Sequence, residues 1–131
     1  MIISVASGKG GTGKTLVATS LALSLKDTYN VQLLDCDASD SPPSPDREAF
    51  HKICTNVGIH CHILEYRAIE NYLSERAVKY VKGEKYRSLK PYEKLETLTP
   101  GWGKQENWRI AREMTREELD QTDLGEFLNN L

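Results

Sequence analysis

Residues 8–15 form a glycine-rich loop of the kind that binds phosphate. The segment reads Gly8-Lys9-Gly10-Gly11-Thr12-Gly13-Lys14-Thr15. This matches the pattern G-x-x-x-x-G-K-[ST], in which successive backbone N–H groups converge on phosphate oxygens. Lys14 would contact the β- and γ-phosphates, and the Thr15 hydroxyl would bind Mg²⁺. Four glycines in six positions cost conformational entropy, which argues against a turn that binds nothing.

Strand and helix patterns flank this loop and recur along the chain. The β-branched run Ile2, Ile3 and Val5 precedes the loop, and a helical pattern follows it. We expect strands over 1–6, 31–35 and 59–64, helices over 14–27 and 46–57, and C-terminal helices over about 67–82, 104–113 and 116–130. The helix over 46–57 should end at Gly58, and Thr115 with Glu118 should form a capping box.

This order predicts an α/β fold, with a small parallel sheet of about three strands, flanking helices and a helical C-terminal part. We interpret residues 1–131 as a single α/β domain. Ligands of such sheets bind at the carboxyl ends of the strands. The loop and the pair Asp35 and Asp37 fall on that same edge.

Residues 1–38 resemble the MinD/ParA/Mrp ATPases. The shared features are Lys9 inside the phosphate loop, the run from Leu21 to Leu25, and the sequence Leu33-Leu34-Asp35-Cys36-Asp37. The resemblance implies ATP or ADP with Mg²⁺ as ligands, and Lys9 acting on the phosphates within one chain or across a homodimer. It implies that Asp37 supports Mg²⁺ and the attacking water. The L-L-D-C-D wording is closest to Mrp-type members, which implies an iron–sulfur protein as a partner.

These ATPases also need a later strand that ends in an aspartate and a glycine. The candidate Asp123-Leu124-Gly125 lies in a polar segment with a helical pattern. We therefore expect a nucleotide-binding segment, 1–40, with weak or absent hydrolysis.

The remaining segment, 41–131, resembles the C-terminal part of Toprim domains in OLD-family nucleases. The resemblance rests on residues 64–73, 108–115 and 122–128. It implies a metal-dependent nuclease, or an inactive remnant of one, as the alternative function, with nucleic acid as its partner. Asp35, Asp37 and Glu70 would then bind metal, with Ser39 close by and Lys104 as the basic residue. Glu70 has a second interpretation, as an acidic residue at the start of a helix.

Composition favours a small soluble domain. The chain has 131 residues, 39% of them hydrophobic, and a net charge of −2. No apolar run approaches the roughly 20 residues that cross a bilayer, and the N-terminus lacks the pattern of a signal peptide. Three cysteines without a C-x-x-C motif favour a reducing, cytoplasmic setting.

Two further patterns have two interpretations each. A basic stretch interleaved with tyrosines is either a nucleic-acid surface or a solvated helix face; its cations are Arg76, Lys79, Lys82, Lys85, Arg87, Lys90 and Lys94. In His60-Cys61-His62, strand alternation would place the histidines on one side and Cys61 on the other, which argues against a zinc site.

Overall fold

The computed structural model describes residues 14–35 and 45–131. The side chains at positions 14, 15 and 46 are not part of that description. The predicted strand over 1–6 and the loop over 7–13 lie outside the described residues, as do residues 36–44.

Two parallel strands form the described sheet. Strand β1 (Gln32–Asp35) pairs with β2 (His60–Ile63), so that Gln32 lies opposite His60 and Asp35 opposite Ile63. Helix α2 (Pro45–Asn56) connects them and begins with proline, which tolerates the first helical position because no N–H is needed there. Gly58, with φ of 77°, follows the helix as predicted. The structure thus confirms the α/β class and two of the expected strands.

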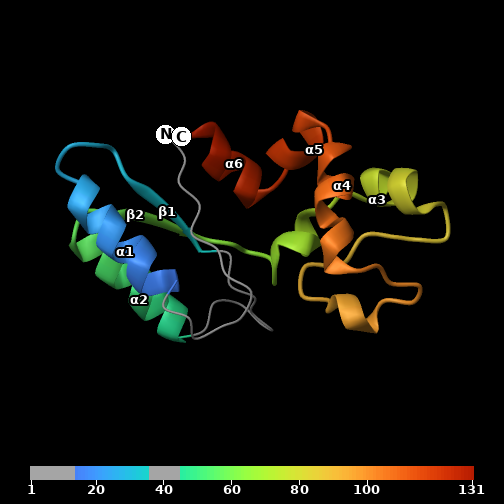
Figure 1. Cartoon of the computed structure of the whole chain (residues 1–131), viewed down its shortest axis with the longest axis horizontal. Coiled ribbons are helices and arrows are strands. Elements are labelled where there is room, and N and C mark those ends of the chain that lie inside the picture. The colour runs from blue at the N-terminus through green and yellow to red at the C-terminus, as the bar shows by residue number, and fades with distance from the viewer. Residues whose placement is uncertain (1–13, 36–44) are drawn as a thin grey trace.

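Helices α1 (Lys14–Leu25) and α2 pack on one face of this sheet. Alternate strand residues point to the same face. Leu33 and Cys61, which are paired across the strands, pack with Ala22 of α1 and Cys54 of α2. Figure 1 shows these two helices beside the strands at one end of the molecule.

The C-terminal helix α6 (Asp123–Asn129) covers the opposite face of the sheet. Leu34, on that face, belongs to a cluster with Leu124. The ring of Phe127 stacks on His60 and His62, at centroid distances of 6.4 and 5.1 Å. The last helix of the chain therefore completes the core around the strands.

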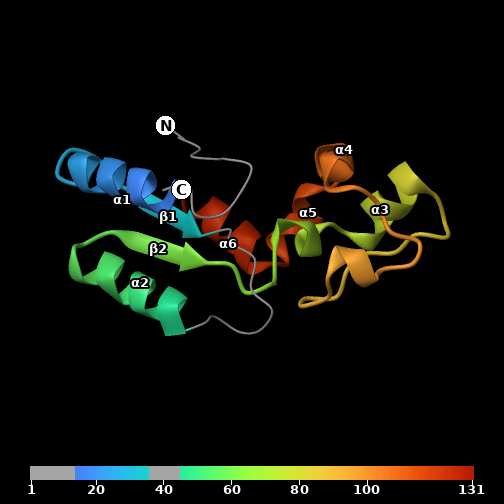
Figure 2. The same ribbon diagram turned by 60° about the horizontal axis from the view of Figure 1, so that its bottom comes forward.

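The rest of the chain forms a separate helical core at the other end of the molecule (Figure 2). Its elements are η1 (Ile69–Tyr72), α3 (Glu75–Lys82), η2 (Leu95–Thr97), η3 (Lys104–Glu106), α4 (Asn107–Arg112) and α5 (Arg116–Asp120). The buried residues of this helical core are Leu73, Ala77, Val78, Leu89, Leu95, Leu98, Trp102 and Ile110.

Two of the predicted C-terminal helices are broken, and those predictions were wrong in extent. Between η1 and α3 the chain is extended at Leu73 and Ser74. Ser74 is the N-cap of α3, and its hydroxyl oxygen accepts from the backbone N–H of Ala77. Likewise, Thr122 separates α5 from α6 by capping the second helix. The predicted Thr115–Glu118 capping box is confirmed.

Candidate functional site

The predicted phosphate loop ends where α1 begins. The structure starts this helix at Lys14, directly after the glycine-rich segment. The predicted phosphate and catalytic residues Gly8 to Gly13, Lys9 and Asp37 lie outside the described residues. Of the predicted metal ligands, Asp35 and Glu70 have side chains in the described part of the chain.

Asp35 is the last residue of β1 and is paired with Arg47 from the first turn of α2. Arg47 donates from Nε to Asp35 Oδ2 at 2.9 Å and from Nη2 to the Asp35 backbone oxygen at 3.2 Å. The two side chains are only 11% and 15% exposed. The third nitrogen, Arg47 Nη1, is buried and meets no hydrogen-bond acceptor in the described part of the chain. Sequence reasoning did not name Arg47.

A second carboxylate follows the neighbouring strand. Ile63 is the register partner of Asp35, and Glu65 comes two residues later at the same edge of the sheet. The backbone N–H of Leu64 donates to the backbone oxygen of Asp35 at 3.4 Å, so the two strands stay hydrogen-bonded one residue beyond the end of β2. Glu65 is exposed, and its backbone oxygen accepts from the Tyr92 hydroxyl at 2.6 Å.

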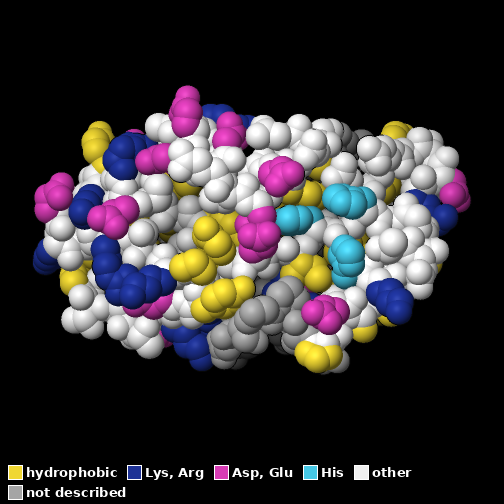
Figure 3. Space-filling view, turned by 180° about the vertical axis from the view of Figure 1, so that it is seen from behind, with side chains coloured by type: hydrophobic (Ala, Val, Ile, Leu, Met, Phe, Trp, Pro, Cys, Tyr) yellow, Lys and Arg dark blue, Asp and Glu magenta, His cyan; other side chains and the backbone are white. Residues whose placement is uncertain are grey.

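Asp123 connects the end of β2 to α6. Its Oδ2 lies 2.7 Å from His62 Nε2 and accepts from the backbone N–H of Glu65 at 3.1 Å. Its Oδ1 accepts from the Tyr72 hydroxyl at 2.7 Å. Burial raises the pKa of Tyr72, and the hydrogen bond to the Asp123 carboxylate and its charge add to this increase, whereas the hydrogen bond from the Tyr66 backbone opposes it. Asp123 therefore holds three segments together. When the molecule is seen from behind, histidine side chains lie beside acidic ones on its surface (Figure 3).

Glu70 lies in the helical half and faces Lys104. Its side chain is 4% exposed, and Lys104 Nζ approaches Oε1 to 2.8 Å, in an ion pair that lacks hydrogen-bond geometry. Two of the residues that the nuclease resemblance selected, Glu70 and Lys104, are thus partners of each other. The described residues contain no group of three or more His, Cys, Asp or Glu side chains that could hold a metal.

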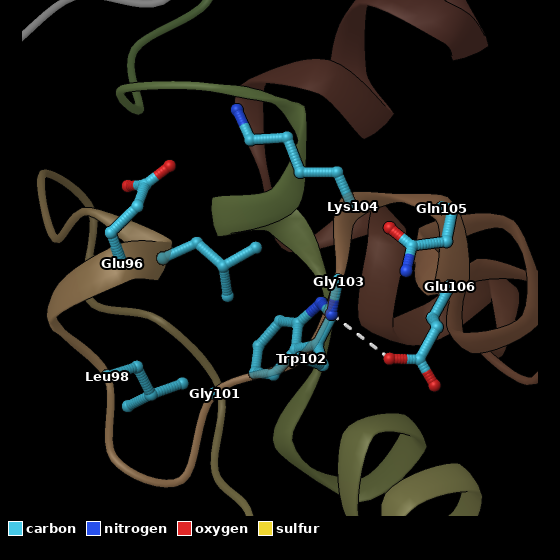
Figure 4. A pocket seen from close by; sticks show the side chains of 9 residues that line it. Glu96, Leu98, Gly101, Trp102, Gly103, Lys104, Gln105 and Glu106 are labelled. Carbon is cyan, nitrogen blue, oxygen red and sulfur yellow. Dashed lines mark hydrogen bonds between the residues drawn. The ribbon is translucent and has the colours of Figure 1, made fainter.

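A hollow of about 600 Å³ lies beside this ion pair, between η2 and η3. Figure 4 shows Trp102 at its centre and the hydrogen bond from the Gly103 N–H to Glu106, which measures 3.0 Å. Trp102 is only 7% exposed and its Nε1 donates to Asn107 Oδ1 at 2.9 Å. The indole is therefore part of the helical core, and the hollow lies in the helical half of the molecule.

The basic stretch is largely neutralised by ion pairs within the helical half. The pairs are Arg76 with Glu118, Lys79 with Glu75, Lys82 with Glu106, and Arg87 with Glu93. Two of these pairs, Arg76 with Glu118 and Lys82 with Glu106, connect α3 to other helices, and the other two lie within one helix or one loop. Both interpretations of the stretch, a nucleic-acid surface and a solvated helix face, stay predictions.

Strand alternation around Cys61 is as predicted. His60 and His62 contact Phe127, while Cys61 is buried in the cluster on the other face with Cys54. Burial raises the pKa of the Cys61 thiol to about 12. A thiol in this setting behaves as a small apolar side chain.

A family model described as the CobQ/CobB/MinD/ParA nucleotide binding domain matches residues 3–121. The chain belongs to this family. Family membership supports the nucleotide-binding interpretation of the loop. The match continues well into the segment compared above with OLD-family nucleases, and the comparisons give that second resemblance no support.

One curated relative is the "Uncharacterized protein MJ0578" of Methanocaldococcus jannaschii, 48% identical over 42 residues. The match covers 32% of this chain and 15% of that protein, so the chain spans only a small part of its relative's length. No solved structure matches the chain significantly. Among the described helices, none is long and apolar enough to cross a membrane.

Proposed function

We propose that this protein binds ATP or ADP together with Mg²⁺. The backbone N–H groups of residues 10–15 and the Lys14 ammonium would hold the phosphates. The Thr15 hydroxyl and Asp37 would lie on the magnesium side. Lys9 would add positive charge at the phosphates, within the chain or across a homodimer.

The observation that carries the proposal is the family match, which includes the loop, both described strands and the helix between them. The geometry adds support. Helix α1 begins at Lys14, so its positive end adjoins the loop, and the parallel strands β1 and β2 end at a common edge.

We further propose that hydrolysis is slow. Strand β2 lies beside β1 but continues as Leu64-Glu65-Tyr66, without an aspartate and glycine. The alternative, Asp123, is held by His62, Tyr72 and the backbone of Glu65 and is 7% exposed, so it is not free to respond to a γ-phosphate. Phosphoryl transfer needs several positioned charges acting together.

We also propose a homodimer, an iron–sulfur partner protein and a cytoplasmic setting, each on the basis of a single sequence feature. The dimer rests on Lys9, and the iron–sulfur partner on the likeness of Leu33 to Asp37 to Mrp-type ATPases. The reducing setting rests on the cysteines; Cys54 and Cys61 are both free and buried. We also propose that residues 1–131 act as one domain, because α6 packs on the strands.

Thermal unfolding with ATP, ADP or GTP, each with and without Mg²⁺, tests nucleotide binding. A ligand at about 100 times its Kd stabilises the protein by roughly 2.7 kcal/mol. We expect Lys14→Ala to abolish this gain and to leave the empty protein folded. Lys52→Ala, on the exposed face of α2, is the matched control and should respond like the wild type. Equal responses of wild type and Lys14→Ala would contradict the proposal.

Phosphate release at several protein concentrations tests the hydrolysis rate. We expect turnover well below about 1 s⁻¹, the low end of common enzyme rates, and a turnover that rises with protein concentration if Lys9 acts across a dimer. Fast turnover that is independent of concentration would show that Glu65 or another group replaces the missing aspartate.

A further inference from the structure

We propose that Arg47 binds the phosphates of the bound nucleotide, and that its ion pair with Asp35 positions it for this contact. The inference rests on the proposed nucleotide binding and adds a residue outside the phosphate loop. Arg47 would be a positioning and binding residue contributed by α2.

The first support is the incomplete hydrogen bonding of a buried cation. Nε and Nη2 are used by the Asp35 carboxylate and backbone oxygen, whereas Nη1 is buried without an acceptor in the described part of the chain. A buried donor without a partner is destabilising, and more so when it is charged. Among the described residues, Asp35 is the sole carboxylate within 4 Å of this guanidinium. A ligand oxygen would complete the set.

The second support is the position of the guanidinium in the fold. Asp35 ends β1, and its backbone oxygen, which accepts from Arg47, also accepts from the Leu64 N–H just past β2. Arg47 is therefore fixed at the carboxyl ends of both strands. Parallel α/β sheets bind their ligands at this edge.

The third support is chemical. A guanidinium presents its N–H groups in a rigid planar fork that suits phosphate oxygens. Here Asp35 binds one side of the fork and prevents rotation of the guanidinium. The ion pair therefore fixes the direction in which Nη1 points. A carboxylate that orients an arginine in this way reduces the ordering that phosphate binding would otherwise require.

The decisive variant is Arg47→Lys, because it keeps the positive charge and removes Nη1. We expect calorimetric titration to show roughly tenfold to hundredfold weaker binding of Mg-ATP, the range for a charged hydrogen bond. Inorganic tripolyphosphate with Mg²⁺ should lose affinity by the same factor, since the contact is to phosphate. Arg109→Lys, an exposed arginine on α4, is the control and should bind both ligands like the wild type.

The Asp35→Asn background separates ligand contact from a purely structural ion pair. If Arg47 binds phosphate, Arg47→Lys should weaken Mg-ATP in this background too. Arg47→Gln, which removes the charge, should weaken it further. If the effect of Arg47→Lys disappears once Asp35 is neutral, or is seen with ATP but not with tripolyphosphate, the inference is overturned. Wild-type protein that binds neither ligand would overturn the proposed function itself and this inference with it.

Discussion

The strand-containing half and the helical half of this molecule bury their apolar side chains to different degrees. In the described part of the chain, the cluster between the strands, α1 and α2 contains four buried residues: Ala22, Cys54, Ile59 and Cys61. The helical core contains eight. Helix α1 exposes Leu16, Val17 and Leu23 at 71, 55 and 42%.

Helix α1 explains much of this difference. Residues 16–25 include no charged side chain, although surface helices usually carry charges on their outer face. The helical half, in contrast, has a dense set of ion pairs on its surface, including Arg76 with Glu118 and Arg87 with Glu93. Helix α1 thus presents an apolar outer surface in the half that carries the predicted nucleotide site, whereas the helical half carries paired charges on its surface.

The largest expected effect comes from truncating one isoleucine in each half. Ile59 is 1% exposed and Ile110 is 0% exposed, so each alanine variant should lose about 2–5 kcal/mol of the free energy of unfolding. Because Leu34, Leu124 and Tyr72 form one cluster across both halves, we expect a single transition in urea. Mg-ATP should then raise the midpoint of both variants equally. Two separate transitions, of which only one responds to nucleotide, would show that the halves unfold independently.

A smaller effect is expected from the ion pair of Glu70. Lys104→Met removes the cation from a carboxylate that is 4% exposed, and should destabilise the protein by about 1–3 kcal/mol. Glu70→Gln should cost less, because it removes the buried charge together with its need for a partner. Chemical denaturation of both variants and of the double variant measures the coupling.

The same Glu70→Gln variant also tests the metal role that the nuclease resemblance implied. Mn²⁺ titration without nucleotide should give the same result for this variant and for the wild type. A loss of Mn²⁺ affinity would restore Glu70 as a metal ligand.

The smallest effect should appear at acid pH in the helical half. Arg76, by hydrogen bonding, holds the pKa of Glu118 at about 2, below its ordinary value of 4.5. A lowered pKa in the folded state stabilises the protein above about pH 4.5, and this contribution is lost as the pH falls towards 2. Since Arg76 is half exposed, solvent screening keeps the effect small. Thermal melts between pH 5 and 2 should show a weaker pH dependence for Glu118→Gln than for the wild type; identical curves would mean that the pair contributes nothing.

The sequence predicted the local elements well where one signal dominated. The start of α1 at Lys14, the strands around Leu33 and Cys61, and the Thr115 capping box all follow from short-range chemistry. The extent of the later helices was not predictable, because the caps Ser74 and Thr122 interrupt patterns that are otherwise helical.

The contacts of the site depend on long-range packing. Arg47 had a signal in the sequence, since it shares a helix face with Phe50 and Cys54 at spacings of three and four residues, and a cation on that apolar face needs a partner. Nothing in the sequence identified Asp35 as that partner. The sequence correctly placed Asp123 in a helix. It gave no sign of the hydrogen bonds to His62 and Tyr72, which lie 61 and 51 residues away in the chain.

The sequence by itself determined the phosphate-loop motif, the α/β class and the alternation of the strands, because these follow from backbone freedom, side-chain period and local caps. Only the tertiary structure decided which charges meet. It paired Asp35 with Arg47 and Glu70 with Lys104, and it placed the C-terminal helix on the back of the sheet. A buried charge must find a partner wherever the fold brings one, and that choice depends on the three-dimensional packing of segments far apart in the chain.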